Sequence, residues 1–271
     1  MISRIRKGDY NMNRIDQCFA QLKENKKKAL ITFLTAGDPS LALTEEAVLA
    51  MFENGADIVE LGVPFSDPIA ESAVIQEASL RSLANNTTLD GIFDVVRSLR
   101  KKTDKPLALM MYLNTIFVYG TEKFFSLCKE CGVDGVIVPD MPYEEREELL
   151  PFAQKYDVYS MNLVSPVSKN RIREIAANSV GFLYCVTSNG VPEAGSPAAG
   201  AFDEFLSLVD ETSACPYCVG GELNEKAQIV ATASRADGVV IDSAIVQIMA
   251  KGGPDVVAEV GKFVADIRAS I

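Results

Sequence analysis

Hydrophobic positions along the chain fall into short apolar runs that alternate with longer amphipathic segments. The short runs are rich in aliphatic and β-branched residues, which is typical of buried parallel strands. In the longer segments apolar residues recur at helical spacing, most clearly at 89–99, 122–128, 144–155 and 255–267. An alternation of strands and helices predicts an α/β fold built on a parallel sheet. The predicted strands are residues 29–33, 58–61, 106–111, 135–138, 158–164, 182–186, 217–219 and 239–241.

A repeated sequence pattern favours a closed sheet over an open one. Gly55-Ala56-Asp57, Gly132-Val133-Asp134 and Arg235-Ala236-Asp237 each place a small residue and an aspartate directly before a predicted strand. An open doubly wound sheet would carry a glycine-rich dinucleotide-binding turn after an early strand, and none is present. The 271 residues also match the roughly 250 that a (β/α)8 barrel needs. We therefore predict a single (β/α)8 TIM barrel.

The N-terminal part of the chain precedes the first βα unit. Residues 1–11 are polar and basic, and we expect them to form a disordered extension. Residues 12–25 have the pattern of an extra helix before the first strand. The barrel domain is accordingly expected to span residues 12–271.

Composition and charge exclude several classes of function. The formal net charge is −11, which argues against nucleic acid or an anionic membrane as a partner. No apolar run approaches the roughly 18 residues of a membrane-spanning helix, and no signal peptide is recognisable, so we expect a cytoplasmic protein. The chain has no histidine, which rules out a histidine-based triad, metal ligand or general base.

Six cysteines include two C-x-x-C pairs, Cys128/Cys131 and Cys215/Cys218. Such pairs can hold zinc or act as a redox dithiol, and the redox role requires the first cysteine at a helix N-terminus. The first pair instead ends a predicted helix, and the second runs into a predicted strand and a Gly-Gly turn. We expect no metal site and no redox site at either pair.

Two carboxylates separated by a proline-bounded loop are the candidate chemical groups. Glu60 interrupts the apolar run at 58–61, and Glu71 follows the loop. A buried carboxylate is costly unless it is paired or used, so this arrangement is consistent with acid/base chemistry. It is equally consistent with a structural glutamate whose oxygens accept hydrogen bonds from loop N–H groups.

The stretch from Glu60 to Glu71 closely resembles the signature of the tryptophan synthase alpha subunit, in which a strand ends in a catalytic glutamate and runs into Pro-Phe-Ser-Asp-Pro. Further stretches resemble motifs of that family in the same order, at 33–39, 111–114, 138–142 and 242–246. The resemblance implies a barrel lyase that cleaves indole-3-glycerol phosphate to indole and glyceraldehyde 3-phosphate. It implies no cofactor in this subunit and a possible beta subunit, which carries pyridoxal phosphate, as a partner.

The resemblance also assigns roles to residues. Glu60 matches the family's general acid and base, and Glu71 matches a second acid, usually aspartate, that stabilises positive charge at the indole nitrogen. The extra methylene of Glu71 shifts its carboxylate by about 1 Å, a displacement that can be costly in catalysis. We place Tyr184 with these catalytic residues. Tyr184 and Phe33 resemble family positions that line the indole pocket, and Tyr112, at the mouth of the third strand, is expected to bind the substrate together with Phe33.

The phosphate end departs from the family pattern. Gly190, Gly220, Gly221 and Ser243 fit a backbone cradle for phosphate, but the three positions at which the family has glycine are acidic here. A like-charge pair 4–6 Å apart costs about 3–4 kcal/mol at an effective dielectric constant near 20. Phosphate binding is therefore expected to be weakened. The acidic positions are Glu193, Glu222 and Asp242.

Three readings of the function follow from this mixture of matches and departures. The first is the family's lyase activity, which we favour because the fold, the general acid and the pocket aromatics agree. The second is a catalytically impaired alpha-like protein that docks on a beta subunit. The third is a barrel enzyme with altered specificity for a substrate without phosphate.

Overall fold

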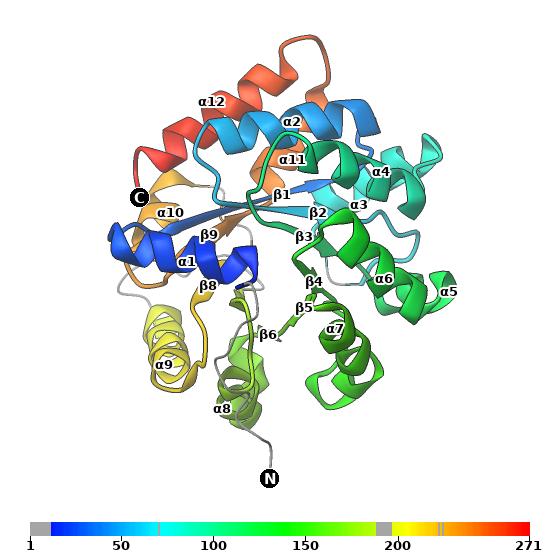
Figure 1. The fold of residues 1–271 in the computed structure, drawn as a ribbon. Coiled ribbons are helices and arrows are strands. Elements are labelled where there is room, and N and C mark those ends of the chain that lie inside the picture. The colour runs from blue at the N-terminus through cyan, green and yellow to red at the C-terminus, as the bar shows by residue number, and fades with distance from the viewer. Residues whose placement is uncertain (1–11, 70, 188–196, 222, 224) are drawn as a thin grey trace.

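The computed structural model describes residues 12–69, 71–187, 197–221, 223 and 225–271. Nine strands of this part of the chain pair in parallel in the order β5-β4-β3-β2-β1-β9-β8-β7-β6, with helices around them (Figure 1). The strands are β1 (Ala29–Thr35), β2 (Ile58–Gly62), β3 (Leu107–Met110), β4 (Gly135–Ile137), β5 (Tyr159–Met161), β6 (Leu163–Val164), β7 (Leu183–Val186), β8 (Tyr217–Gly220) and β9 (Gly238–Ile241).

The two ends of this sheet meet, so the predicted barrel is confirmed. Strands β5 and β6 are separated by Asn162 alone, and together they occupy the predicted strand at 158–164. β5 pairs with β4, whereas β6 pairs with β7. The Asn162 carbonyl still accepts a hydrogen bond from the Tyr184 N–H at 3.0 Å. The break therefore marks the point at which one predicted strand changes its pairing partner. The other seven predicted strands are all present.

The helices fill the connections between strands. The predicted helix at 144–155 is wrong in one respect, because it is divided into a 3₁₀ turn, η1 (Tyr143–Glu148), and α7. Pro151 lies in the first turn of α7 and has no N–H to donate, so it favours a helix start there over an uninterrupted helix. The α-helices are α1 (Arg14–Glu24), α2 (Leu41–Glu53), α3 (Ala73–Ala84), α4 (Leu89–Arg100), α5 (Leu113–Tyr119), α6 (Thr121–Cys131), α7 (Leu150–Tyr156), α8 (Ile172–Ala177), α9 (Pro197–Thr212), α10 (Lys226–Ala233), α11 (Ser243–Lys251) and α12 (Val256–Arg268), with a second 3₁₀ turn, η2, at Pro166–Arg171.

The extra N-terminal helix closes the end of the barrel at which the strands begin. Asn13 caps α1, because its side chain accepts the Ile15 N–H at 2.9 Å. Ile15, Phe19 and Leu22 are buried and belong to the same cluster as the inward-facing barrel side chains. Residues 1–11, predicted to be an extension, lie outside the described residues.

The repeated aspartates stabilise the same end of the barrel. A carboxylate oxygen of Asp57 accepts the Leu30 N–H at 2.8 Å, Asp134 accepts the Leu107 N–H at 2.9 Å, and Asp237 accepts the Tyr217 N–H at 3.0 Å. In each case the aspartate precedes one strand and binds the beginning of its neighbour. The sequence repeat is thus a repeated strand-start contact.

Two negative findings apply to the described residues. None of their helices is long and apolar enough to cross a lipid bilayer. Within the same part of the chain, no group of three or more Cys, Asp or Glu side chains is arranged to hold a metal ion. Cys128 and Cys131 lie at the end of α6, and Cys218 lies within β8, as expected from the sequence.

Candidate active site

Glu60 points into the barrel. Side chains alternate along β2, and Val59 and Leu61 pack outward in the cluster formed with the surrounding helices. Ile58 belongs to the inner cluster that α1 closes, which places Glu60, two residues further on, on the same inner face. Glu60 is two residues before Gly62, the last residue of β2, and therefore lies close to the C-terminal mouth of the barrel.

The environment of Glu60 favours its protonated form. The side chain is fully buried, and among the described residues neither carboxylate oxygen has a hydrogen-bond partner. Burial, followed by the negative charge of Asp242, raises the pKa of Glu60 to about 8. At neutral pH the group is mostly a carboxylic acid, and it can donate a proton and take one back near the operating pH. The alternative expected from the sequence was a structural glutamate whose oxygens accept hydrogen bonds from loop N–H groups. It does not fit, because no described group donates a hydrogen bond to either oxygen.

Tyr184 lies on the inner face of β7, in the same interior cluster as Ile58. Burial raises the pKa of its hydroxyl well above the ordinary value, and the charges of Glu60 and Asp242 act in the same direction. Its hydroxyl fits only because residue 220 is glycine, since a Cβ added to Gly220 would lie 2.5 Å from the Tyr184 Oη. Gly220 therefore has a packing role in addition to its place at the predicted phosphate loop.

Phe33 pairs in register with Glu60 on the neighbouring strand. It is almost fully buried and packs against Ile75 and Ala78 of α3 and Val246 of α11. A Cβ added to Gly62 would overlap its ring, so the glycine at the end of β2 makes room for the aromatic side chain. Phe33 and Tyr184 thus supply two aromatic walls near Glu60.

Glu71 and Tyr112 meet across the mouth. The Tyr112 hydroxyl donates a hydrogen bond to the Glu71 carboxylate and accepts one from the Ile69 N–H at 2.8 Å. Its ring stacks on Phe65 with a centroid separation of 4.7 Å. Tyr112, predicted as a substrate-binding residue, is therefore held by groups of the loop between β2 and α3.

The predicted phosphate end is described only in part. Gly190, Glu193 and Glu222 lie outside the described residues. Gly221 has a φ of +105° and lies against the Thr187 backbone, a conformation and a close approach that favour glycine. Asp242 caps α11, and its carboxylate accepts the Ser243 N–H at 2.5 Å. The Ser243 hydroxyl lies 3.1 Å from that of Ser72. Ser72 was not predicted, and only its position directly after Glu71 could have indicated it.

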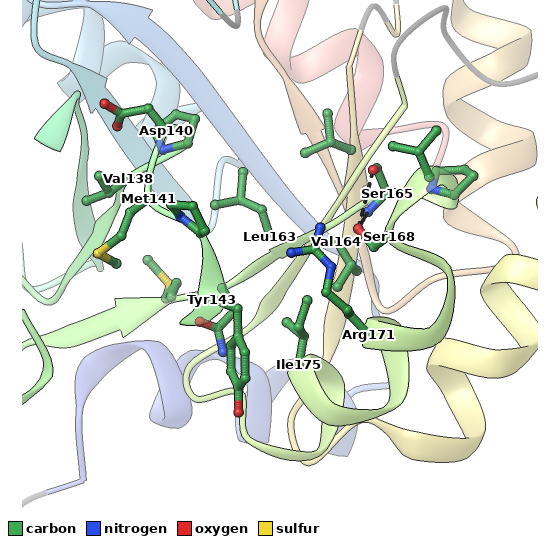
Figure 2. Close-up of a pocket in the computed structure, with 17 residues that line it drawn as sticks. Val138, Asp140, Met141, Tyr143, Leu163, Val164, Ser165, Ser168, Arg171 and Ile175 are labelled. Atoms are coloured by element: carbon green, nitrogen blue, oxygen red, sulfur yellow. Dashed lines mark hydrogen bonds between the residues drawn. The ribbon is translucent and has the colours of Figure 1, made fainter. Parts of the chain in front are cut away.

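A cleft of about 480 Å³ lies between the ends of β4 and β6. Figure 2 shows Met141 and Tyr143 on one side, Ser165, Ser168 and Arg171 on the other, and Leu163 between them. The cleft contains neither Glu60 nor Glu71. Its Asp140, from the Val-Pro-Asp-Met-Pro stretch, accepts the Leu113 N–H at 3.0 Å and so stabilises the start of α5. Sequence reasoning did not predict this cleft, since its walls come from two separate connections.

Comparisons with known proteins agree with the geometry. The family model described as "Tryptophan synthase alpha chain" matches residues 19–269. The tryptophan synthase alpha chain of Caldanaerobacter subterraneus subsp. tengcongensis is 44% identical over 95% of this chain and 99% of its own length. The crystal structure of the alpha subunit from Legionella pneumophila has a TM-score of 0.85 at 34% identity, covering 96% of this chain and 99% of that one. A structure of the α2β2 complex from Pyrococcus furiosus gives a TM-score of 0.82 at 31% identity, covering 89% of this chain and 98% of that one.

Proposed function

Because the chain belongs to the tryptophan synthase alpha chain family, we propose that it cleaves indole-3-glycerol phosphate to indole and glyceraldehyde 3-phosphate. The observation that carries this proposal is Glu60, a fully buried carboxyl on the inner face of β2 whose pKa is raised to about 8. A barrel with its chemistry at the C-terminal ends of the strands is consistent with that position.

The reaction requires one proton donor that becomes a proton acceptor. The Glu60 carboxylic acid protonates C3 of the indole ring, which leaves positive charge on the ring nitrogen. The resulting carboxylate removes the proton of the side-chain hydroxyl next to the ring, the bond between C3 and that carbon breaks, and its electron pair returns to the ring. Glyceraldehyde 3-phosphate and indole are released, and Glu60 ends protonated as it began.

Glu71 is the group that offsets the charge on the ring nitrogen in this proposal. Its carboxylate is held by Tyr112, which follows β3 by two residues and precedes α5, so the second acid is held by a second βα connection and not only by its own loop. In this proposal Phe33 and Tyr184 flank the indole ring. The phosphate lies toward Gly220 and Gly221, at the end of β8, and toward Ser243, the first residue of α11.

A beta subunit is the expected protein partner, as in the α2β2 complex from Pyrococcus furiosus. Large apolar side chains are exposed on the loop after β2 and on α5, which follows β3, and both segments lie at the mouth. Ile69 is 81% exposed, Phe117 46% and Val118 80%. Burial of these side chains in a complex would remove apolar surface from water. A cytoplasmic location is consistent with this biosynthetic role.

The test is release of indole from indole-3-glycerol phosphate by the full chain, with and without a beta subunit. We expect Glu60→Gln to lower kcat by at least a hundredfold, since the amide cannot transfer the proton. The matched control is Glu53→Gln, the same change at an exposed position on α2. Failure of the unmodified chain to release indole under either condition would overturn the proposal, as would near-normal turnover by Glu60→Gln.

A further inference from the structure

Ser72 is an N-cap serine whose side chain does not bind its own helix. It directly precedes α3 and has the extended backbone of an N-cap residue, with φ of −65° and ψ of 159°. A serine at this place normally accepts an N–H of the first helical turn. Among the described residues, Ser72 makes no such side-chain bond to α3. By contrast, Ser40, the N-cap of α2, accepts the Leu43 N–H at 3.2 Å.

The Ser72 hydroxyl instead contacts Ser243, the first residue of α11. The two hydroxyl oxygens lie 3.1 Å apart, although the residues are 171 positions apart in the chain. Ser243 is buried, whereas Ser72 is partly exposed. The two helices also pack on each other through Ile75 and Val246, in a cluster that contains Phe33. The N-terminus of α3 is thus held beside the N-terminus of α11.

The phosphate of the proposed substrate lies at this point. In the proposed reaction it is directed toward Ser243, at the positive end of the α11 dipole. A phosphate oxygen bound by the Ser243 hydroxyl is within reach of a second hydroxyl 3.1 Å away. Since a serine hydroxyl rotates and can donate as well as accept, Ser72 can turn its proton toward the phosphate. A hydrogen bond to an anion is stronger than one between two neutral hydroxyls.

Ser72 is also joined by a single peptide bond to Glu71, the second acid of the proposed reaction. The Glu71 carboxylate accepts a hydrogen bond from the Tyr112 hydroxyl, and its backbone carbonyl accepts one from the Gln76 side chain at 3.0 Å. A bond from Ser72 to the phosphate would fix the chain one residue beyond the acid. The phosphate and the second acid are therefore connected through one short segment of backbone.

We propose that Ser72 is a positioning residue, which donates a hydrogen bond to the phosphate of the substrate and thereby fixes Glu71 at the indole nitrogen. The inference rests on the proposed cleavage of indole-3-glycerol phosphate. Binding energy from the phosphate, which does not react, is then used to orient a group at the reacting centre. Ser72 consequently contributes to turnover only when the substrate carries a phosphate.

Kinetics on indole-3-glycerol phosphate and on indole-3-glycerol, which lacks the phosphate, separate this role from a structural one. We expect Ser72→Ala to lower kcat for the phosphorylated substrate by about tenfold and to leave kcat for indole-3-glycerol unchanged. Ser72→Thr keeps the hydroxyl and should retain the activity of the unmodified chain. Ser40→Ala is the matched control, because it removes a serine that does cap its own helix. It should lower stability without changing either kcat.

Calorimetry with glycerol 3-phosphate tests the phosphate contact without turnover. We expect Ser72→Ala to bind it about tenfold more weakly than the unmodified chain, equivalent to about 1.4 kcal/mol, while Ser40→Ala binds it with unchanged affinity. Unchanged affinity in Ser72→Ala, or no binding by the unmodified chain, would overturn the proposal. An equal fall in kcat on both substrates would also overturn it. Weaker binding by Ser72→Ala, with cleavage of neither substrate by any protein, would support the phosphate contact and overturn only the proposed reaction.

Discussion

Tyr112 and Glu71 are joined by a hydrogen bond, with the tyrosine hydroxyl as donor and the carboxylate as acceptor. The two residues are 41 positions apart in the chain. The same hydroxyl accepts the Ile69 N–H, so one side chain at the end of β3 holds both the backbone of the loop after β2 and the acid that this loop carries. Glu71 is consequently positioned by a tyrosine that is itself 3% exposed and stacked on Phe65.

Removal of the Tyr112 hydroxyl should impair turnover more than substrate binding. We expect Tyr112→Phe to lower kcat by about tenfold, because a misplacement of about 1 Å at a reacting centre is costly. Steady-state kinetics with indole-3-glycerol phosphate would measure the effect. Tyr119→Phe is the matched control, since Tyr119 donates to Asp90 on the exposed surface. A change of similar size in both variants, or in neither, would contradict a positioning role for Tyr112.

Glu60 should make the stability of the protein depend on pH. Its pKa is raised from 4.5 to about 8 in the folded chain, so the folded state holds a proton that the unfolded state releases. The associated stability is fully present below about pH 4.5 and is lost as the pH rises through 8, at a rate of up to about 1.4 kcal/mol per pH unit. Urea unfolding of the unmodified chain and of Glu60→Gln, from pH 5 to 9, would measure it. A parallel decline in both proteins would contradict this account.

Gly220→Ala should disturb Tyr184. The added Cβ would lie 2.5 Å from the Tyr184 Oη and 2.8 Å from the Val240 Cβ, so the tyrosine or the strand must move. We expect a loss of about 1–3 kcal/mol in the free energy of unfolding, as for other overpacked cores. Partial recovery in the Gly220→Ala/Tyr184→Phe double variant would identify the hydroxyl as the source of the clash.

The matched change for that experiment is Gly200→Ala, in α9. Among the described residues, no heavy atom lies within 4 Å of the Cβ that this substitution adds. Since alanine is the better helix former, Gly200→Ala should leave stability unchanged or raise it by up to about 1 kcal/mol. Equal losses at positions 200 and 220 would show that the effect is not specific to the contact with Tyr184.

Asp134 and Asp237 should differ in importance although they occupy equivalent places in the repeat. Asp134 is 3% exposed and binds Arg14 and Arg100 as well as the Leu107 N–H. Asp134→Ala should cost about 3–5 kcal/mol in thermal or urea unfolding, because it leaves the largely buried Arg100 guanidinium without its carboxylate partner. Asp237→Ala, at an exposed position, should cost about 1 kcal/mol. Equal losses would indicate that only the strand-start hydrogen bond matters.

The barrel could be predicted from the sequence because its strands and helices each have a recognisable local pattern of apolar residues. Buried parallel strands need continuous apolar runs and their helices need apolar residues at helical spacing, and both requirements are visible within a few neighbouring residues. The motif from Glu60 to Glu71, with the later stretches in the same order, was enough to indicate the family. The exact limits of the elements were harder to predict, as the division of the 144–155 helix at Leu149 and of the fifth strand at Asn162 shows.

The contacts between residues that are far apart in the sequence could be seen only in the tertiary structure. The repeat of Asp57, Asp134 and Asp237 was visible in the chain, but its hydrogen bonds to the beginnings of neighbouring strands were not. The sequence likewise showed acidic residues at the phosphate end, yet the direction of Asp242 became clear only from its contact with α11. The physical reason is that a hydrogen bond or a buried charge depends on which groups the closed barrel brings within a few ångströms of each other. The apolar pattern determines that the barrel forms, whereas side-chain packing at its mouth determines how the acids act.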